Sequence, residues 1–180
     1  MERPVLRTER LTIRAITAED WAAIGAIWED FEASEFRVYD TPKCTEESDL
    51  RARIARWAEA TASGNDHLFF AAEREGQVIG FCSFNAREEG HEIAYGFLRA
   101  AQHQGYASET LRALFEYLRT LGITKLTAGT AFRNLPSLAL LRRLGFRLVG
   151  SERLSFRKDE EGNDLFFDGG IFELELEKRK

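Results

Sequence analysis

The chain has 180 residues, of which 44% are hydrophobic and 31% charged, a balance that predicts one globular domain with a substantial core. No apolar run reaches the roughly 18 to 20 residues of a membrane span, and the start lacks the apolar stretch of a secretory signal, so we expect a cytoplasmic protein without a membrane partner. The net charge of −5 argues against nucleic acid as a partner, because neutralising phosphates requires a basic face.

The first third of the chain predicts one strand and two amphipathic helices. Residues 10–16 alternate apolar and polar side chains, which is typical of a strand. Thr17 and Asp20 have capping-box spacing and open a helix whose apolar residues recur at helical intervals up to Phe31. A second helix with one apolar face follows and ends at Gly64.

The remainder predicts more strands than helices. Two β-rich runs separated by Glu75-Gly76 favour an antiparallel hairpin. These two runs are residues 67–72 and 78–85. Four further strands are predicted, at residues 92–98, 124–130, 146–156 and 166–176. Two helices, at residues 108–121 and 134–144, end at Gly122 and Gly145. The order predicts antiparallel pairs with a strand-helix-strand unit between them.

The segment Gln102-His103-Gln104-Gly105-Tyr106-Ala107 joins a predicted strand to the strongest predicted helix. The first N–H groups of a helix lack partners within it, and Gly105 allows the close backbone approach that a pyrophosphate needs. A glycine in such a turn also has a purely conformational explanation. The downstream motifs Asn134-x-x-Ser137 and Leu144-Gly145-Phe146 favour the phosphate-binding interpretation.

With the opening phrase Thr8-Glu9-Arg10-Leu11, these motifs make the sequence resemble the GNAT superfamily of N-acetyltransferases. The resemblance covers residues 6–176 and is to the branch that acetylates the N-terminal alanine or serine of ribosomal proteins. It implies a single GNAT domain over residues 1–180 with an α/β (α+β) fold. The expected mixed central sheet has about seven strands, splayed between the fourth and fifth, and about four flanking helices.

The resemblance also implies acetyl-CoA as cosubstrate, with its pantetheine arm in the gap between the strands at 92–98 and 124–130. No metal is expected, and Cys44 and Cys82 indicate neither a metal cluster nor a disulfide framework. Asn134 also has the pattern of a helix N-cap, and both roles stay open. The cofactor-binding residues implied are Phe97, Leu98, Arg99, Gln102, Gln104, Gly105, Tyr106, Ala107, Asn134 and Ser137.

The catalytic residues are less well defined. Many superfamily members protonate the departing thiolate with a tyrosine at the position of Leu141, so the usual general acid is missing. We hypothesise that Ser137 assists the thiolate and that Glu92 is the general base, with His91 the second candidate. A backbone N–H near Phe97 or Leu98 is expected to stabilise the oxyanion.

For the acceptor we expect a primary amine, in particular a peptide or protein N-terminal α-amine, because its pKa of about 7.7 to 8.0 requires little help from a base. Acids in the segment 29–40, Glu32 and Glu35 among them, are hypothesised to attract the protonated amine, or else form a solvated turn. The alternatives are a small-molecule amine (polyamine, amino sugar or antibiotic) and a noncatalytic acyl-CoA-binding module. Sequence leaves open a monomer or homodimer and any role of His103.

Overall fold

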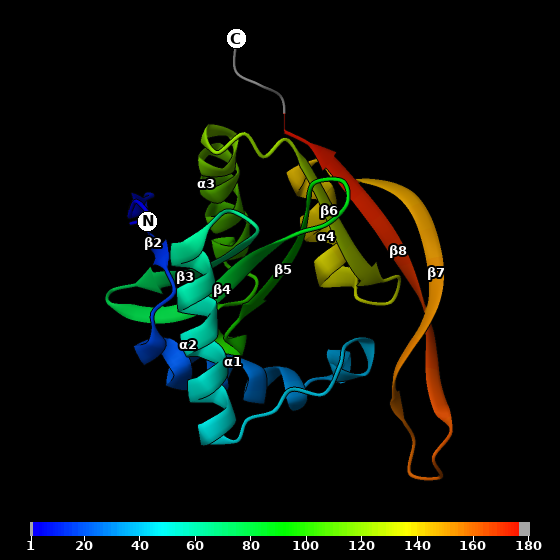
Figure 1. Ribbon diagram of the computed structural model, residues 1–180. Helices are drawn as coiled ribbons and strands as arrows, with labels where there is room; N and C mark the ends of the chain where they lie inside the picture. Colours follow the sequence, from blue (N-terminus) through cyan, green and yellow to red (C-terminus); the bar gives the residue numbers. More distant parts are fainter. Residues whose placement is uncertain (1, 177–180) are drawn as a thin grey trace.

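The computed structural model describes residues 2–176, which form one eight-stranded sheet with helices on both faces (Figure 1). The helices are α1 (Trp21–Glu32), α2 (Glu47–Ser63), α3 (Tyr106–Thr120) and α4 (Leu135–Leu144), with short 3₁₀ turns η1 (Ala18–Asp20), η2 (Glu35–Tyr39) and η3 (Arg99–Ala101). The strands are β1 (Leu6–Arg7), β2 (Thr12–Ala15), β3 (His67–Arg74), β4 (Gln77–Ala86), β5 (His91–Phe97), β6 (Lys125–Ala131), β7 (Arg147–Lys158) and β8 (Asp164–Glu175).

The strands lie in the order β1-β2-β3-β4-β5-β6-β8-β7. Neighbours run antiparallel except β5 and β6, which are parallel and joined through α3. The predicted mixed sheet and its four helices are confirmed. The additional strand, β1, has two residues, too few for an alternating pattern to reveal it.

Each face of the sheet has its own core. Helices α3 and α4 cover one face, where Leu111, Leu114 and Leu141 are fully buried. Helices α1 and α2 cover the other, where Ile24 and Ile54 are fully buried. Full burial of one such side chain contributes about 1.5 to 3 kcal/mol. The central strands are therefore packed between α3 and α4 on one face and α1 and α2 on the other.

The parallel pair β5–β6 is short. Only His91–Leu126 and Glu92–Thr127 are paired, and beyond them the strands separate (Figure 1). All seven residues of β5 pair with β4 on its other side, and β6 pairs along its whole length with β8. The rest of the inner edges of β5 and β6 therefore face each other across a V-shaped gap.

Gly90 closes the narrow end of this gap. Its φ is +85°, and a Cβ placed there would lie 2.3 Å from the Lys125 carbonyl oxygen. No other residue fits so close to the backbone at the start of β6, because any side chain would displace it.

We expect Gly90→Ala to destabilise the fold by more than about 2 kcal/mol, since strain at a positive φ adds to a clash with backbone. Thermal unfolding measures this. Gly162→Ala is the matched control, because Gly162 has φ +87° with nothing within 4 Å of its would-be Cβ. Equal losses in the two variants would show that the contact with Lys125 is unimportant.

Candidate functional site

The loop between β5 and α3 has the backbone geometry of an anion site. Gly105, the N-cap of α3, has φ +82°, and His103 has φ +61°. The first intrahelical bond of the turn runs from the Glu109 N–H to the Gly105 carbonyl, and no side chain caps the helix. The N–H groups that precede Glu109 in the helix thus have no partner within it, and they lie at the positive end of the helix dipole.

The opening phrase of the chain braces this loop. Arg10 Nε donates to Glu109 Oε2 at 2.7 Å, and Arg10 Nη1 donates to the Gln104 carbonyl at 2.9 Å. Thr8 Oγ1 donates to Glu109 Oε1 at 2.6 Å. Burial raises the pKa of the Glu109 carboxyl, but the bonds from Thr8 and Arg10 outweigh it and leave the pKa below its ordinary value. The Thr8-Glu9-Arg10-Leu11 phrase therefore has a structural role in the loop.

The other predicted loop residues mostly turn inward. Gln102 Nε2 donates to the Phe97 carbonyl at 3.1 Å, and Gln104 Nε2 donates to the Ala100 carbonyl at 2.7 Å. Tyr106 is buried, with the Arg10 guanidinium 4.5 Å above its ring centroid. Ala107 packs against the core. These side chains shape the loop, so contact with an anion falls to its backbone N–H groups.

At the end of β5 some backbone N–H groups have hydrogen-bond partners and others face the gap. The Leu98 N–H bonds to the Ile79 carbonyl at 2.9 Å, and the Arg99 N–H bonds to Asp30 Oδ2 at 2.7 Å. Backbone groups alternate sides along an antiparallel strand. Since Leu98 bonds toward β4, the N–H groups of Phe97 and Tyr95 point to the gap. Of the two positions expected to stabilise the oxyanion, only Phe97 has its N–H directed there.

The two candidate bases lie at the narrow end of the gap. The Glu92 side chain is 41% exposed and accepts hydrogen bonds from Arg87, with 2.9 Å between Arg87 Nε and Glu92 Oε2. His91 Nε2 lies 2.8 Å from the Asn65 carbonyl, so Nε2 must be the protonated nitrogen. Its Nδ1 is buried without a hydrogen-bond partner among residues 2–176. The exposed Glu92 carboxylate can bind a substrate amine if its hydrogen bonds to Arg87 are released. Neither nitrogen of His91 is accessible to a substrate, because Nε2 is bonded and Nδ1 is buried.

The start of α4 places Ser137 beside the gap. Asn134 Oδ1 accepts from the Ser137 N–H at 3.2 Å, which confirms the N-cap interpretation of Asn134. Ser137 Oγ lies 2.8 Å from the Tyr95 hydroxyl on β5. Leu141, one turn later, is fully buried and offers no polar atom. Sequence reasoning missed Tyr95, because an aromatic residue within a strand has the pattern of an ordinary core residue.

Glu92 and Ser137 approach the gap from opposite faces of the sheet. Successive side chains alternate faces along β5. A Cβ on Gly96 would lie 3.1 Å from Ile27 of α1, which puts the even-numbered residues, Glu92 included, on the α1 side. Tyr95 bonds to α4 on the other side. A group held in the gap can therefore be reached by a carboxylate from one face and by a hydroxyl from the other.

The family of the chain is shown by its similarity to known proteins. Residues 10–147 match the family model of the acetyltransferase (GNAT) domain. The chain belongs to the GNAT acetyltransferase family. An uncharacterised N-acetyltransferase of Bacillus licheniformis, p20, is 33% identical over 150 residues, which cover 81% of this chain and 83% of p20. The predicted family and enzyme class are thereby confirmed.

Solved structures agree with this acetyltransferase fold. The ribosomal L7/L12 α-N-protein acetyltransferase RimL, in complex with coenzyme A, has a TM-score of 0.82 at 20% identity and covers 97% of this chain and 99% of its own. The ribosomal-protein-S5-alanine acetyltransferase of Vibrio fischeri has a TM-score of 0.81 at 16% identity and covers 99% and 100%. At these identities the likeness confirms the GNAT fold.

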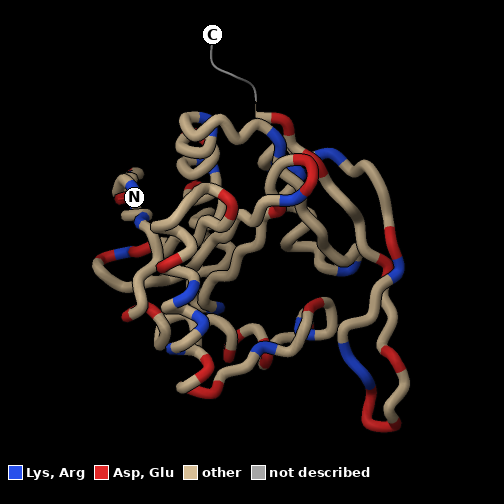
Figure 2. The backbone as a smooth tube through the Cα atoms, viewed as in Figure 1, with Lys and Arg blue, Asp and Glu red and all other residues tan. Residues whose placement is uncertain are grey.

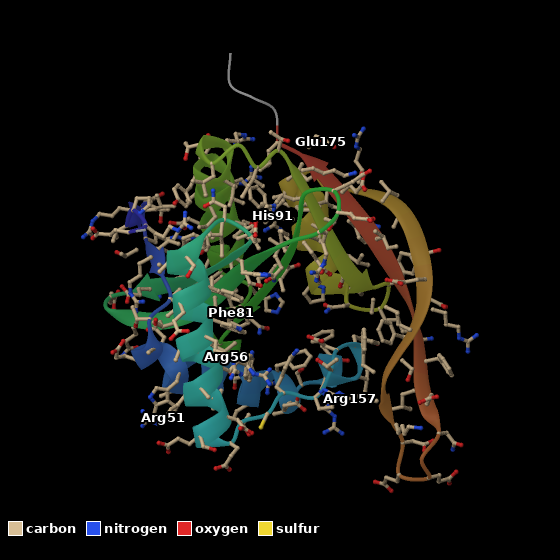
Figure 3. The ribbon with its side chains drawn as sticks, in the orientation of Figure 1. Arg51, Arg56, Phe81, His91, Arg157 and Glu175 are labelled. Atoms are coloured by element: carbon tan, nitrogen blue, oxygen red, sulfur yellow. The ribbon has the colours of Figure 1, made fainter. Side chains whose placement is uncertain are left out.

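An ion pair at the far side of the acetyltransferase's gap joins two distant segments. Arg157 reaches from β7 toward the end of α1 (Figure 3), where its Nη1 and Nη2 donate to Glu32 Oε2 and Oε1 at 2.9 and 2.7 Å. Glu32 Oε1 also accepts from the Lys43 N–H at 2.8 Å. The Arg157 side chain holds the pKa of Glu32 below its ordinary value, against the opposing effect of burial. Arg157 already neutralises the charge of Glu32, so this carboxylate is not free to attract the acceptor amine in this structure.

Other acids of the segment 29–40 are also engaged. Asp30 accepts from the Arg99 N–H, and Asp40 Oδ2 accepts from Lys43 Nζ at 2.6 Å. Basic and acidic residues are interspersed over the backbone, with no continuous basic stripe in the view of Figure 2. Ion pairs therefore neutralise Glu32 and Asp40 of this segment, whereas Glu29 and Glu35 are exposed.

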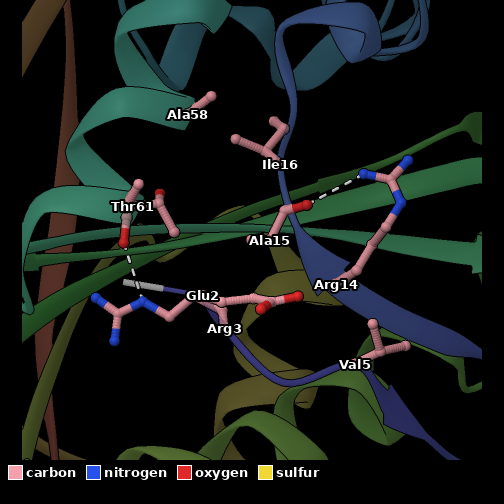
Figure 4. A pocket seen from close by; sticks show the side chains of 9 residues that line it. Glu2, Arg3, Val5, Arg14, Ala15, Ile16, Ala58 and Thr61 are labelled. Carbon is pink, nitrogen blue, oxygen red and sulfur yellow. Dashed lines mark hydrogen bonds between the residues drawn. The ribbon is translucent and has the colours of Figure 1, made fainter.

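A pocket of about 290 Å³ lies away from the gap, between the N-terminal segment, β2 and α2 (Figure 4). Its polar side chains serve the fold, since Arg3 Nε donates to the Thr61 carbonyl at 2.9 Å and Arg14 Nη2 lies 2.8 Å from Asp20 Oδ1.

Among residues 2–176, no three His, Cys, Asp or Glu side chains are grouped to hold a metal ion, and no helix is long and apolar enough to cross a membrane.

Gly105→Ala tests the loop. A Cβ would lie 3.3 Å from Arg10 Nη2 and force a side chain into φ +82°, so we expect a destabilisation of about 1 to 2 kcal/mol and an acetyl-CoA KM at least about tenfold higher. Steady-state kinetics measures this. Gly122→Ala, at φ +79° beyond the end of α3, is the control for strain alone and should keep the wild-type KM. An unchanged KM in Gly105→Ala would contradict the site.

Glu32→Gln tests the ion pair. Loss of the charge should destabilise the fold by about 1 to 3 kcal/mol at neutral pH. Because the folded-state pKa of Glu32 lies below its ordinary value of 4.5, this contribution is present above pH 4.5 and is lost as pH falls through the folded-state pKa. Unfolding curves of wild type and variant should therefore converge in acid, and a constant difference would contradict the assignment.

Proposed function

We propose that this acetyltransferase transfers the acetyl group of acetyl-CoA to the α-amine at the N-terminus of a peptide or protein. Acetyl-CoA as the donor is supported by the V-shaped gap between β5 and β6, which opens next to a loop whose backbone suits a pyrophosphate. A pantetheine arm laid along β5 from that loop would meet N–H groups of Phe97 and Tyr95. RimL, which has this fold, binds coenzyme A.

The residues at the narrow end fit acyl transfer to an amine. Glu92 can take a proton from the amine, directly or through water, and lies on the α1 face. The Phe97 or Tyr95 N–H can bond to the carbonyl oxygen as it becomes negative. Ser137 approaches from the α4 face, where the leaving sulfur would lie. These roles remain predictions for each residue.

The acceptor class is proposed from the charges near the gap. Glu92 is the carboxylate at the narrow end, and it already accepts hydrogen bonds from Arg87. An α-amine, with a pKa near 8, is partly neutral at pH 7, whereas a lysine amine with a pKa of about 10.4 is almost wholly protonated. A polyamine would require several unpaired acids, and Glu32 and Asp40 are already paired with Arg157 and Lys43. These features favour an α-amine over a polyamine.

The test measures thiol release from acetyl-CoA with matched acceptors. Short peptides with a free N-terminus and no lysine are compared with the same peptides blocked at the N-terminus and containing one lysine, and with spermidine. We expect turnover on the free α-amine only. Turnover confined to spermidine or another small amine would replace the proposed acceptor, and tight acetyl-CoA binding with no turnover on any amine would indicate a binding module.

Glu92→Gln tests the proposed base. We expect kcat on the best peptide to fall about 10- to 100-fold at pH 7, because the amine must lose its proton unaided. The defect should shrink as pH rises past the α-amine pKa of about 8. Glu88→Gln, an exposed acid in the preceding turn, is the control and should keep wild-type kcat. A wild-type pH profile in Glu92→Gln would show that Glu92 is not the base.

A further inference from the structure

One hydrogen bond between two hydroxyl groups joins β5 to α4 beside the gap. Tyr95 belongs to β5 and Ser137 to α4, the helix that follows β6, and their oxygens lie 2.8 Å apart. Tyr95 is three residues beyond Glu92, the last residue of β5 that pairs with β6. The bond therefore joins β5 to the helix that follows β6, just beyond the point where the two strands part.

Both partners are held firmly. The Tyr95 ring packs against the core beneath α3 and α4. Burial raises the pKa of Tyr95 to about 12, against the opposing effect of the bond to Ser137. The phenol consequently keeps its proton at neutral pH. Ser137 is fixed by its N–H bond to the Asn134 side chain.

The direction of the bond decides where the remaining proton points. A phenol is the stronger acid of the two hydroxyl groups and hence the better donor. When the Tyr95 O–H donates to Ser137 Oγ, the serine proton is free to point into the gap. A hydroxyl that accepts one hydrogen bond is also polarised to donate another more strongly.

We propose that Tyr95 is a positioning residue that directs the Ser137 hydroxyl toward the leaving sulfur of the thioester; this rests on the proposed function. The amine nitrogen forms the C–N bond to the acetyl carbon, and the C–S bond breaks with its electron pair moving to sulfur. The proton that the nitrogen loses balances the one that the thiolate finally gains, so no further reactant is required. Ser137 stabilises the thiolate by a hydrogen bond, and Tyr95 holds Ser137 in the orientation that permits this bond.

Tyr95→Phe removes only the hydroxyl and keeps the packed ring. We expect kcat to fall about tenfold with the acetyl-CoA KM within about twofold of wild type, because the lost bond matters when charge develops on sulfur. Ser137→Ala should fall by a similar or larger factor. Adding Tyr95→Phe to Ser137→Ala should produce no further loss, since Tyr95 acts through Ser137.

Tyr117→Phe is the matched control. The Tyr117 hydroxyl accepts from Arg3 Nη1 at 3.3 Å, and its ring packs against Phe70 of β3 rather than against β5 or α4. Its loss should leave kcat and KM unchanged. Multiplicative losses in the Tyr95→Phe, Ser137→Ala double variant would overturn the inference, because they would mean that Tyr95 acts independently of Ser137. So would an effect of Tyr95→Phe confined to thermal stability.

A second readout requires no turnover and so separates this inference from the proposed acceptor. The thiol of bound CoA is titrated by the ultraviolet absorption of its thiolate. A hydrogen bond from Ser137 favours the thiolate. The thiol pKa of bound CoA should therefore be lower in wild type than in Tyr95→Phe or Ser137→Ala, by about one pH unit. Equal thiol pKa values in all three proteins would overturn the inference even if peptide acetylation is observed. A difference would support it even if no acceptor is found.

Discussion

The two-residue pairing between β5 and β6 is the constraint on which the site depends. Two parallel strands inside a sheet ordinarily satisfy one another's backbone groups along their length. Here β4 and β8 satisfy the outer edges, Gly90 brings the narrow end together, and the inner edges then part. Backbone groups left facing a gap are costly unless a ligand or water meets them. A ligand with amide groups of its own is suited to that place.

Long-range contacts hold the groups around this gap. Glu109 ties α3 to the start of the chain through Thr8 and Arg10, so the loop before α3 is held from two sides. Arg157 and Glu32 join β7 to the end of α1 across 125 residues. Side chains that approach from both faces can then act on one bound group. The geometry is preorganised, which lowers the cost of ordering a substrate.

The elements and the glycine turn before α3 could be predicted from sequence, because periodicity, glycine positions and caps are local signals. The splay at residues 92–98 and 124–130 came from the family resemblance, and the pairing of β5 with β6 agrees with it. Tyr95 and the partner of Glu32 could not be predicted. Each depends on a contact between residues far apart in the chain, and the side-chain types alone are those of a core aromatic and a solvated acid. The brief strand β1 lacks any pattern at all.

Hydrogen exchange with and without CoA tests most directly whether the ligand lies in the gap. We expect slower exchange at the N–H groups of the loop from His103 to Ser108 and at Tyr95 and Phe97, with little change in β3. Protection confined to the pocket between the N-terminal segment and α2, or absent from β5, would contradict it.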